Sequence, residues 1–179
     1  MSVDHPAAVG ADAGRRQALT RRIRLLVAAT ISYNVIEAAV ALTAGVQASS
    51  SALIGFGLDS VIEVSSAAAV AWQFSKPDHE AREKTALRII AMSFFALAAY
   101  VTVESVRALF GYAEPRPSIV GIVLAAVSLM VMPMLSWAQR RTGRDLGSRS
   151  AVADSKQPLL CTYLSAALLV GLGLNTVFG

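Results

Sequence analysis

The sequence predicts an all-α protein, a polytopic bundle of transmembrane helices. The apolar fraction is 55% and only 16% of the residues are charged, against about 25% charged in ordinary soluble domains. The charges are also clustered, so five apolar segments remain that are long enough to cross a bilayer, which takes about 20 residues. The five predicted spans cover approximately residues 25–46, 51–74, 89–110, 119–138 and 151–178.

The first predicted span follows a polar tail that is rich in small residues. We expect residues 1–21 to be a disordered cytoplasmic tail and residues 22–179 to form the transmembrane domain. The first span contains the polar residues Asn34 and Glu37. A very short turn connects it to the second span, so these two helices should pack as an antiparallel hairpin.

The later spans each carry one informative feature. Glu104 and Arg107, at i and i+3 near the end of the third span, are expected to form an ion pair. Pro133 should kink the fourth span. The helix of the fifth span should begin near Ser150, which places Asp154 inside the protein instead of in a loop.

The positive charges indicate the orientation. Fourteen of the 16 Lys and Arg residues fall before the first span, between the second and third spans, or between the fourth span and the purely apolar part of the fifth, which starts at Leu159. The positive-inside rule places that side of the protein, together with the N-terminus, in the cytoplasm. We expect the protein to lie in the cell membrane. The net charge of +4 follows from this topology, so it does not indicate a nucleic-acid partner.

Two acids lie in the middle of the second span. Asp59 and Glu63 are four residues apart and share one helical face. A carboxylate at that depth costs roughly 2.5 kcal/mol or more, and two carboxylates one turn apart can bind the same divalent cation. The pattern therefore predicts a cation or proton site. The alternative is a buried pair that is neutralised by protonation or by an arginine.

The fifth span carries Asp154, Gln157 and Cys161 on one face, at i, i+3 and i+7. Cys161 can supply a thiolate, a soft ligand for zinc, iron(II), cobalt or cadmium. A lone cysteine in an apolar helix can equally be a small packing residue, and Gln157 before Pro158 can cap or kink the helix. Because the chain has a single cysteine, it cannot form an internal disulfide.

Glu37 and Asn34 share a face of the first span. They are candidates for supporting groups behind the cation ligands or for a proton relay, and the alternative is a hydrogen bond to a neighbouring helix. The sequence shows no nucleophile–base pair, His-rich metal motif or Gly-rich phosphate loop, so we do not expect an enzyme or a permanently bound cofactor.

At these residues the chain resembles the cation diffusion facilitator family of divalent metal/proton antiporters, in a short form without the cytoplasmic domain. The resemblance covers residues 22–178 and rests on Asn34 and Glu37, on Ser50-Ser-Ala-Leu53 before the acidic second span, and on the Asp154–Cys161 pattern. It implies a four-ligand metal site at Asp59, Glu63, Gln157 and Cys161. We expect Asp154, like Glu37, to orient ligands or relay protons, and a second copy of the chain is a candidate partner.

Three features depart from the family. Gln157 stands where histidine is common, Cys161 stands where aspartate is common, and the family normally has six spans. We expect a carrier that exports a divalent cation (zinc, iron, cobalt, manganese or cadmium) in exchange for protons. The alternatives are a non-transporting integral membrane subunit, or a fragment of a carrier whose sixth span lies outside this sequence.

Overall fold

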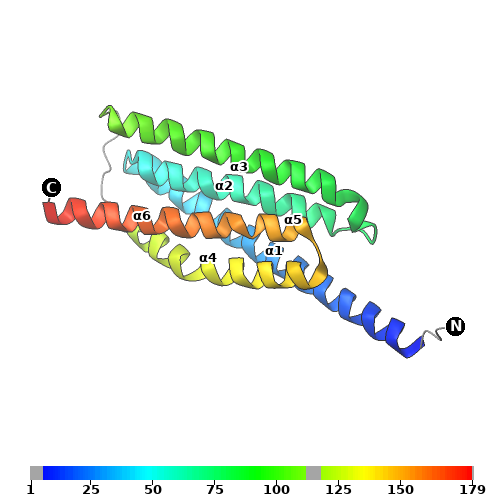
Figure 1. Cartoon of the computed structure of the whole chain (residues 1–179). Coiled ribbons are helices and arrows are strands. Elements are labelled where there is room, and N and C mark those ends of the chain that lie inside the picture. The colour runs from blue at the N-terminus through cyan, green and yellow to red at the C-terminus, as the bar shows by residue number, and fades with distance from the viewer. Residues whose placement is uncertain (1–5, 112–117, 179) are drawn as a thin grey trace.

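The computed structural model describes residues 6–111 and 118–178 (Figure 1). Every regular element in these two ranges is a helix, which confirms the all-α prediction. The helices are α1 (Pro6–Gln47), α2 (Ser51–Gln73), α3 (His79–Leu109), α4 (Ile119–Leu146), α5 (Arg149–Asp154) and α6 (Lys156–Phe178).

Four of these helices are long and apolar enough to cross a membrane. The segments are Asp12–Gln47, Ala52–Gln73, His79–Arg107 and Ile119–Leu146, and they cover most or all of each of the first four predicted spans. The predicted fifth span, residues 151–178, corresponds to most of α5 and all of α6, and its passage through the membrane stays a prediction. Helix α5 begins at Arg149, close to the predicted start at Ser150, but the single predicted helix is divided at Ser155 into α5 and α6.

Helix α2 lies at the centre of the bundle, with α1 and α3 as neighbours and with contacts to α5 and α6. Helix α4 packs against α1 and α6. The α1–α2 pair forms the predicted hairpin, and Gly45 allows its close approach: a Cβ atom there would lie 2.9 Å from the backbone nitrogen of Ile54. At the start of α2, the Ser50 hydroxyl accepts a hydrogen bond from the Leu53 amide, which caps the helix.

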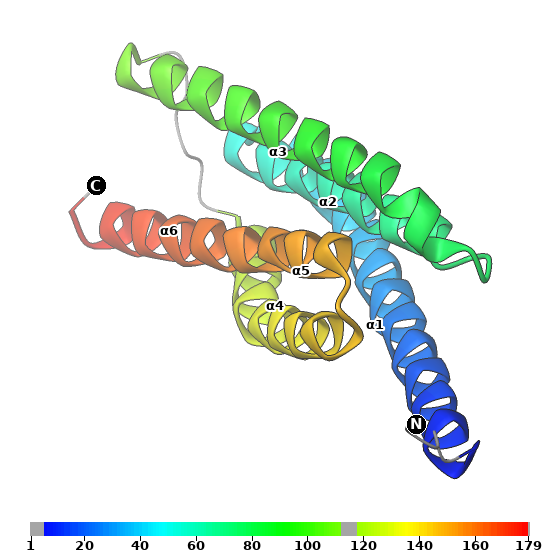
Figure 2. The ribbon, with the colours of Figure 1, turned by 45° about the vertical axis from the view of Figure 1, so that its right-hand side comes forward.

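Three cation-bearing segments lie at one end of the bundle. Figure 1 shows the start of α1, the α2–α3 connection and the α4–α5 connection at this end, and the α1–α2 turn at the other. The first part of α1 projects beyond the other helices in both views (Figure 2). The arrangement of the connections agrees with the alternation that the charge pattern predicted.

Three boundaries differ from the prediction. The expected disordered tail is helical from Pro6 onward, and residues 1–5 lie outside the described residues. Helix α3 begins at His79 instead of residue 89, and α4 continues to Leu146 instead of residue 138. In each case a helix that already exists is extended by residues of adequate helix propensity, which avoids the cost of a new nucleus. Gly147, at φ 73°, ends α4 in the left-handed region.

Two other predictions concern α3 and α4. Arg107 and Glu104 form the predicted ion pair, at 2.9 Å between Nη1 and Oε1. Helix α4 continues through Pro133 without ending.

Candidate cation site

Four acidic side chains are buried in the interior of the bundle. Glu37 on α1, Asp59 and Glu63 on α2, and Asp154 on α5 are each at most 3% exposed. In the described part of the chain, the Lys and Arg ion pairs involve other acids, namely Glu80, Glu83 and Glu104. No arginine therefore neutralises the four buried acids within these residues, which removes one of the alternatives left open by the sequence.

Glu37 is surrounded by hydroxyl groups. Its Oε2 accepts a hydrogen bond from Ser60 on α2 at 2.8 Å, and its Oε1 accepts from Tyr33 on α1 at 3.2 Å and from Ser128 on α4. The carboxylate therefore joins three helices and has donors for both oxygens. Ser60 is the neighbour of Asp59 in the sequence, so Glu37 fixes the position of α2 beside the predicted ligand.

Asp154 is likewise satisfied by its neighbours. Ser66 on α2 donates to Oδ1, and the Gln139 amide on α4 donates to Oδ2. One residue further on, Ser136 on α4 donates to the backbone oxygen of Ser155 at 2.7 Å. These bonds fix the junction of α5 and α6 against α2 and α4, one turn before Gln157.

Asp59 and Glu63 lack such donors. Oδ2 of Asp59 and both carboxylate oxygens of Glu63 are buried and have no hydrogen-bond partner within the described residues. The Asn34 amide group on α1 donates to the backbone oxygen of Thr30 at 3.0 Å, and neither Glu63 oxygen accepts a hydrogen bond from it. Burying polar atoms without partners costs free energy, so this pair differs from Glu37 and Asp154 in its need for a ligand.

Helix α6 brings the remaining predicted ligands to the same interior. The Cys161 side chain is 1% exposed and belongs to the same core cluster as Phe56 of α2. Gln157, one turn earlier, is buried, and its Nε2 also has no partner among the described residues. Three of the four predicted ligands thus carry buried polar atoms without partners, and the fourth is the buried thiol of Cys161.

The predicted ligands are not yet gathered around one point. Across the described residues, no three His, Cys, Asp or Glu side chains meet in a group that could hold a metal ion. Asp59, Glu63 and Cys161 would therefore have to move toward one another to enclose a cation. The four-ligand set remains a prediction.

Several polar residues of α2 lie between this pair of acids and one end of the bundle. Asp59, Glu63, Ser66 and Gln73 share one face of the helix and are buried, and the buried apolar Val70 separates Ser66 from Gln73 on that face. Asp59 lies 14 residues from Gln73, about 21 Å along the helix. Toward the other end, the buried neighbours Phe56 and Leu53 are apolar. The buried polar residues of this face therefore lie on the side of the cation-rich end of the bundle.

Several residues that hydrogen-bond to the buried acids were not identified from the sequence. Ser66 could have been identified, because it lies three residues after Glu63 on the same face of α2. No comparable spacing points to the groups on the other helices that hold Glu37 and Asp154, which are Tyr33, Ser128 and Gln139.

Comparison of the chain with family models, with curated proteins and with solved structures gives no match.

Proposed function

We propose that this protein is a divalent metal cation transporter in which Asp59 and Glu63 bind the cation in exchange for protons. The observation that carries the proposal is the pair's environment: both side chains are buried, without a Lys or Arg partner, and three of their oxygens accept no hydrogen bond among the described residues. Such a pair is stable only when protons or a cation neutralise it.

The groups around the pair suit a divalent transition metal. Carboxylate oxygens bind hard and borderline cations, and a thiolate at Cys161 would favour softer ones. The amide of Gln157 can turn its oxygen toward a cation, since its Nε2 has no partner to lose. Zinc, iron(II), cobalt, manganese and cadmium are therefore the candidate substrates.

Exchange follows from competition at one site. The ligands must lose their protons to bind a metal, so metal binding releases protons. The buried polar residues of α2 lie on the side of the cation-rich end, which we place in the cytoplasm together with the N-terminus, so we expect the cation to enter from that side. Opening toward the opposite side would then allow incoming protons to expel the metal, which couples export to the proton gradient.

Glu37 and Asp154 serve as positioning residues in this scheme. Their oxygens already accept hydrogen bonds from serine, tyrosine and glutamine side chains. They hold α1, α4 and the start of α6 against α2, and so set the distance between Asp59 and Cys161.

Membership of the cation diffusion facilitator family, residence in the cell membrane and homodimer formation belong to the same proposal. They rest on the sequence resemblance and on the charge distribution. The competing reading is a membrane subunit that does not transport, whose acids only hold helices together.

Proteoliposomes test the proposal. The purified chain is reconstituted with a pH-sensitive dye inside, and a zinc, manganese or cadmium gradient is applied. We expect metal-driven proton movement with the wild type, none with Asp59→Asn, and normal movement with the control Glu104→Gln, whose acid lies in the ion pair with Arg107. Equal flux in Asp59→Asn, or none in the wild type with any of the metals, would refute the assignment.

A further inference from the structure

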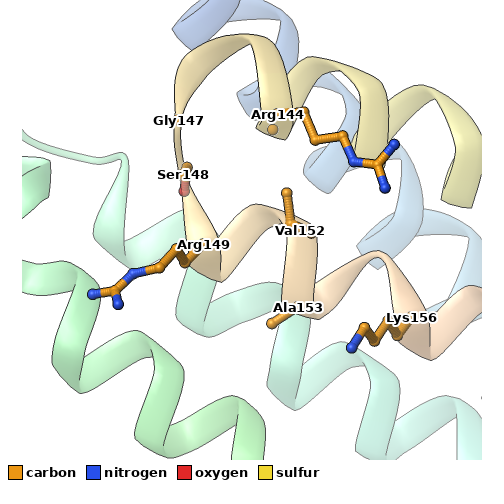
Figure 3. A pocket seen from close by; sticks show the side chains of 8 residues that line it. Arg144, Gly147, Ser148, Arg149, Val152, Ala153 and Lys156 are labelled. Carbon is orange, nitrogen blue, oxygen red and sulfur yellow. The ribbon is translucent and has the colours of Figure 1, made fainter.

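A pocket opens between the end of α4 and the start of α5 (Figure 3), and none of the four buried acids is among its lining residues. Its volume is about 340 Å³. Among the eight described residues that line it, three are cationic and none is acidic: Gly143, Arg144, Gly147, Ser148, Arg149, Val152, Ala153 and Lys156. The pocket thus combines an apolar wall with positive charge.

The three cations have different surroundings. Arg149 turns toward α3 (Figure 3), where its Nε lies 3.8 Å from Glu83 Oε2. Arg144 and Lys156 come from two different helices, both are exposed, and neither forms an ion pair within the described residues. In Figure 3 the Val152 side chain points from α5 toward α4, and the Arg144 and Lys156 side chains do not point toward each other, so both have to turn to reach one anion. Arg144 and Lys156 are therefore free to bind an anion at this pocket.

Each of these two cations ends an exposed apolar stripe on its own helix. On α4, Arg144 and Arg141 share a face with Trp137, Met134 and Met130, which are 61%, 72% and 73% exposed. On α6, Lys156 shares a face with Leu160 and Tyr163, which are 36% and 64% exposed. Both helices can cross a bilayer in our account, so these stripes face lipid chains.

Trp137 indicates where the pocket lies across the thickness of the membrane. The Arg141 guanidinium lies 5.5 Å from the centre of the Trp137 ring. Tryptophan concentrates at the interface between lipid chains and head groups, and the pocket begins two turns further along α4. The cations at the pocket thus stand at the level where lipid phosphates are found.

We propose that this pocket binds the phosphate of an anionic phospholipid, with the acyl chains along the exposed stripes of α4 and α6. Basic pockets between transmembrane helices bind acidic head groups in this way. Arg144 and Lys156 bind the phosphate, and Val152 and Ala153 contact the glycerol and the first methylenes. This binding does not depend on metal transport, because none of the pocket residues is a predicted cation ligand.

Native mass spectrometry of the full chain in detergent tests the proposal, with phosphatidylglycerol and phosphatidylcholine as probes. A Lys or Arg near an anionic lipid contributes about 1 kcal/mol, or about 5-fold in affinity, so loss of two such charges should weaken phosphatidylglycerol binding about 30-fold. We expect this loss in Arg144→Gln/Lys156→Gln, with phosphatidylcholine binding unchanged. The control Arg21→Gln/Arg22→Gln removes two exposed charges at the same end of the bundle and should bind like the wild type.

A second variant tests the space inside the pocket independently of its positive charge. Val152→Phe fills the space without changing any charge, and it should also reduce phosphatidylglycerol binding. Circular dichroism of all variants verifies that they are folded. The proposal is overturned if both double variants lose binding equally, if Val152→Phe binds like the wild type, or if inorganic phosphate binds as tightly as the lipid, in which case the ligand is a free anion.

Discussion

Glu63 and Glu37 are both buried glutamates, yet replacing each by methionine should change stability in opposite directions. Glu63 has two carboxylate oxygens without partners, whereas Glu37 accepts hydrogen bonds from Tyr33, Ser60 and Ser128. Methionine keeps a similar volume in both places. The comparison therefore isolates the effect of the unsatisfied polar atoms.

The expected magnitudes follow from the hydrogen bonds. An unsatisfied buried polar group costs roughly 1–3 kcal/mol, so Glu63→Met should stabilise the metal-free protein by about that amount. Glu37→Met removes the acceptor of three hydroxyls and should destabilise by roughly 1–3 kcal/mol. At about 2–4 °C per kcal/mol for a chain of this size, the two variants should move the unfolding temperature in opposite directions.

Thermal unfolding in detergent with a chelator measures both effects. Added zinc should then stabilise the wild type, by about 2.7 kcal/mol at a hundred times its Kd, and should leave Glu63→Met unchanged. If Glu63→Met is as destabilising as Glu37→Met, then Glu63 is a structural residue and the distinction drawn between the two acids is wrong.

Two further predictions concern packing and the connection between helices. Gly45→Ala should destabilise by about 1–3 kcal/mol, because the new methyl group would lie 2.8 Å from Cγ1 and 2.9 Å from the backbone nitrogen of Ile54. Gly14→Ala, with nothing within 4 Å, should stabilise by about 0.5–1 kcal/mol; chemical unfolding compares the two, and equal effects would contradict the α1–α2 packing. Glu83→Ala should cost about 1–3 kcal/mol, since Glu83 Oε1 accepts from the Arg149 amide at 2.6 Å and the Ser150 amide at 3.3 Å. The control Glu80→Ala breaks only an exposed ion pair with Arg16, which is worth about 0–1 kcal/mol. If Glu80→Ala lowers the unfolding free energy more than Glu83→Ala does in the same assay, Glu83 does not hold the start of α5 as described.

The sequence predicted those parts of the fold that depend on the bilayer. Long apolar runs define α2 almost to the residue, because a membrane span must be both apolar and helical. The charged extensions of α3 and α4 were missed, since helix outside the bilayer needs no apolar run and their charges resemble those of a loop. The Gly147 C-cap and the helix-favouring residues between His79 and Arg88 were the available signals.

The candidate site was predicted only in part. Helical spacing placed Asp59 with Glu63, and Gln157 with Cys161, because neighbours on one helix follow from periodicity alone. The hydrogen bonds that distinguish Glu37 and Asp154 from the other two acids join residues up to 91 positions apart. Such contacts depend on how the helices pack, which a single sequence does not specify.

The proton count on metal binding tests the central claim most directly. Isothermal titration of zinc, manganese and cadmium into the full chain, in two buffers of different ionisation enthalpy, gives the affinity and the number of protons released. We predict one tight site, and at least one proton is released for each metal ion bound. The affinity should fall about tenfold for each unit by which the pH is lowered, for each proton displaced. Binding should be lost in Asp59→Asn. Binding without proton release, equal binding by Asp59→Asn, or no binding of any of these metals would contradict the account.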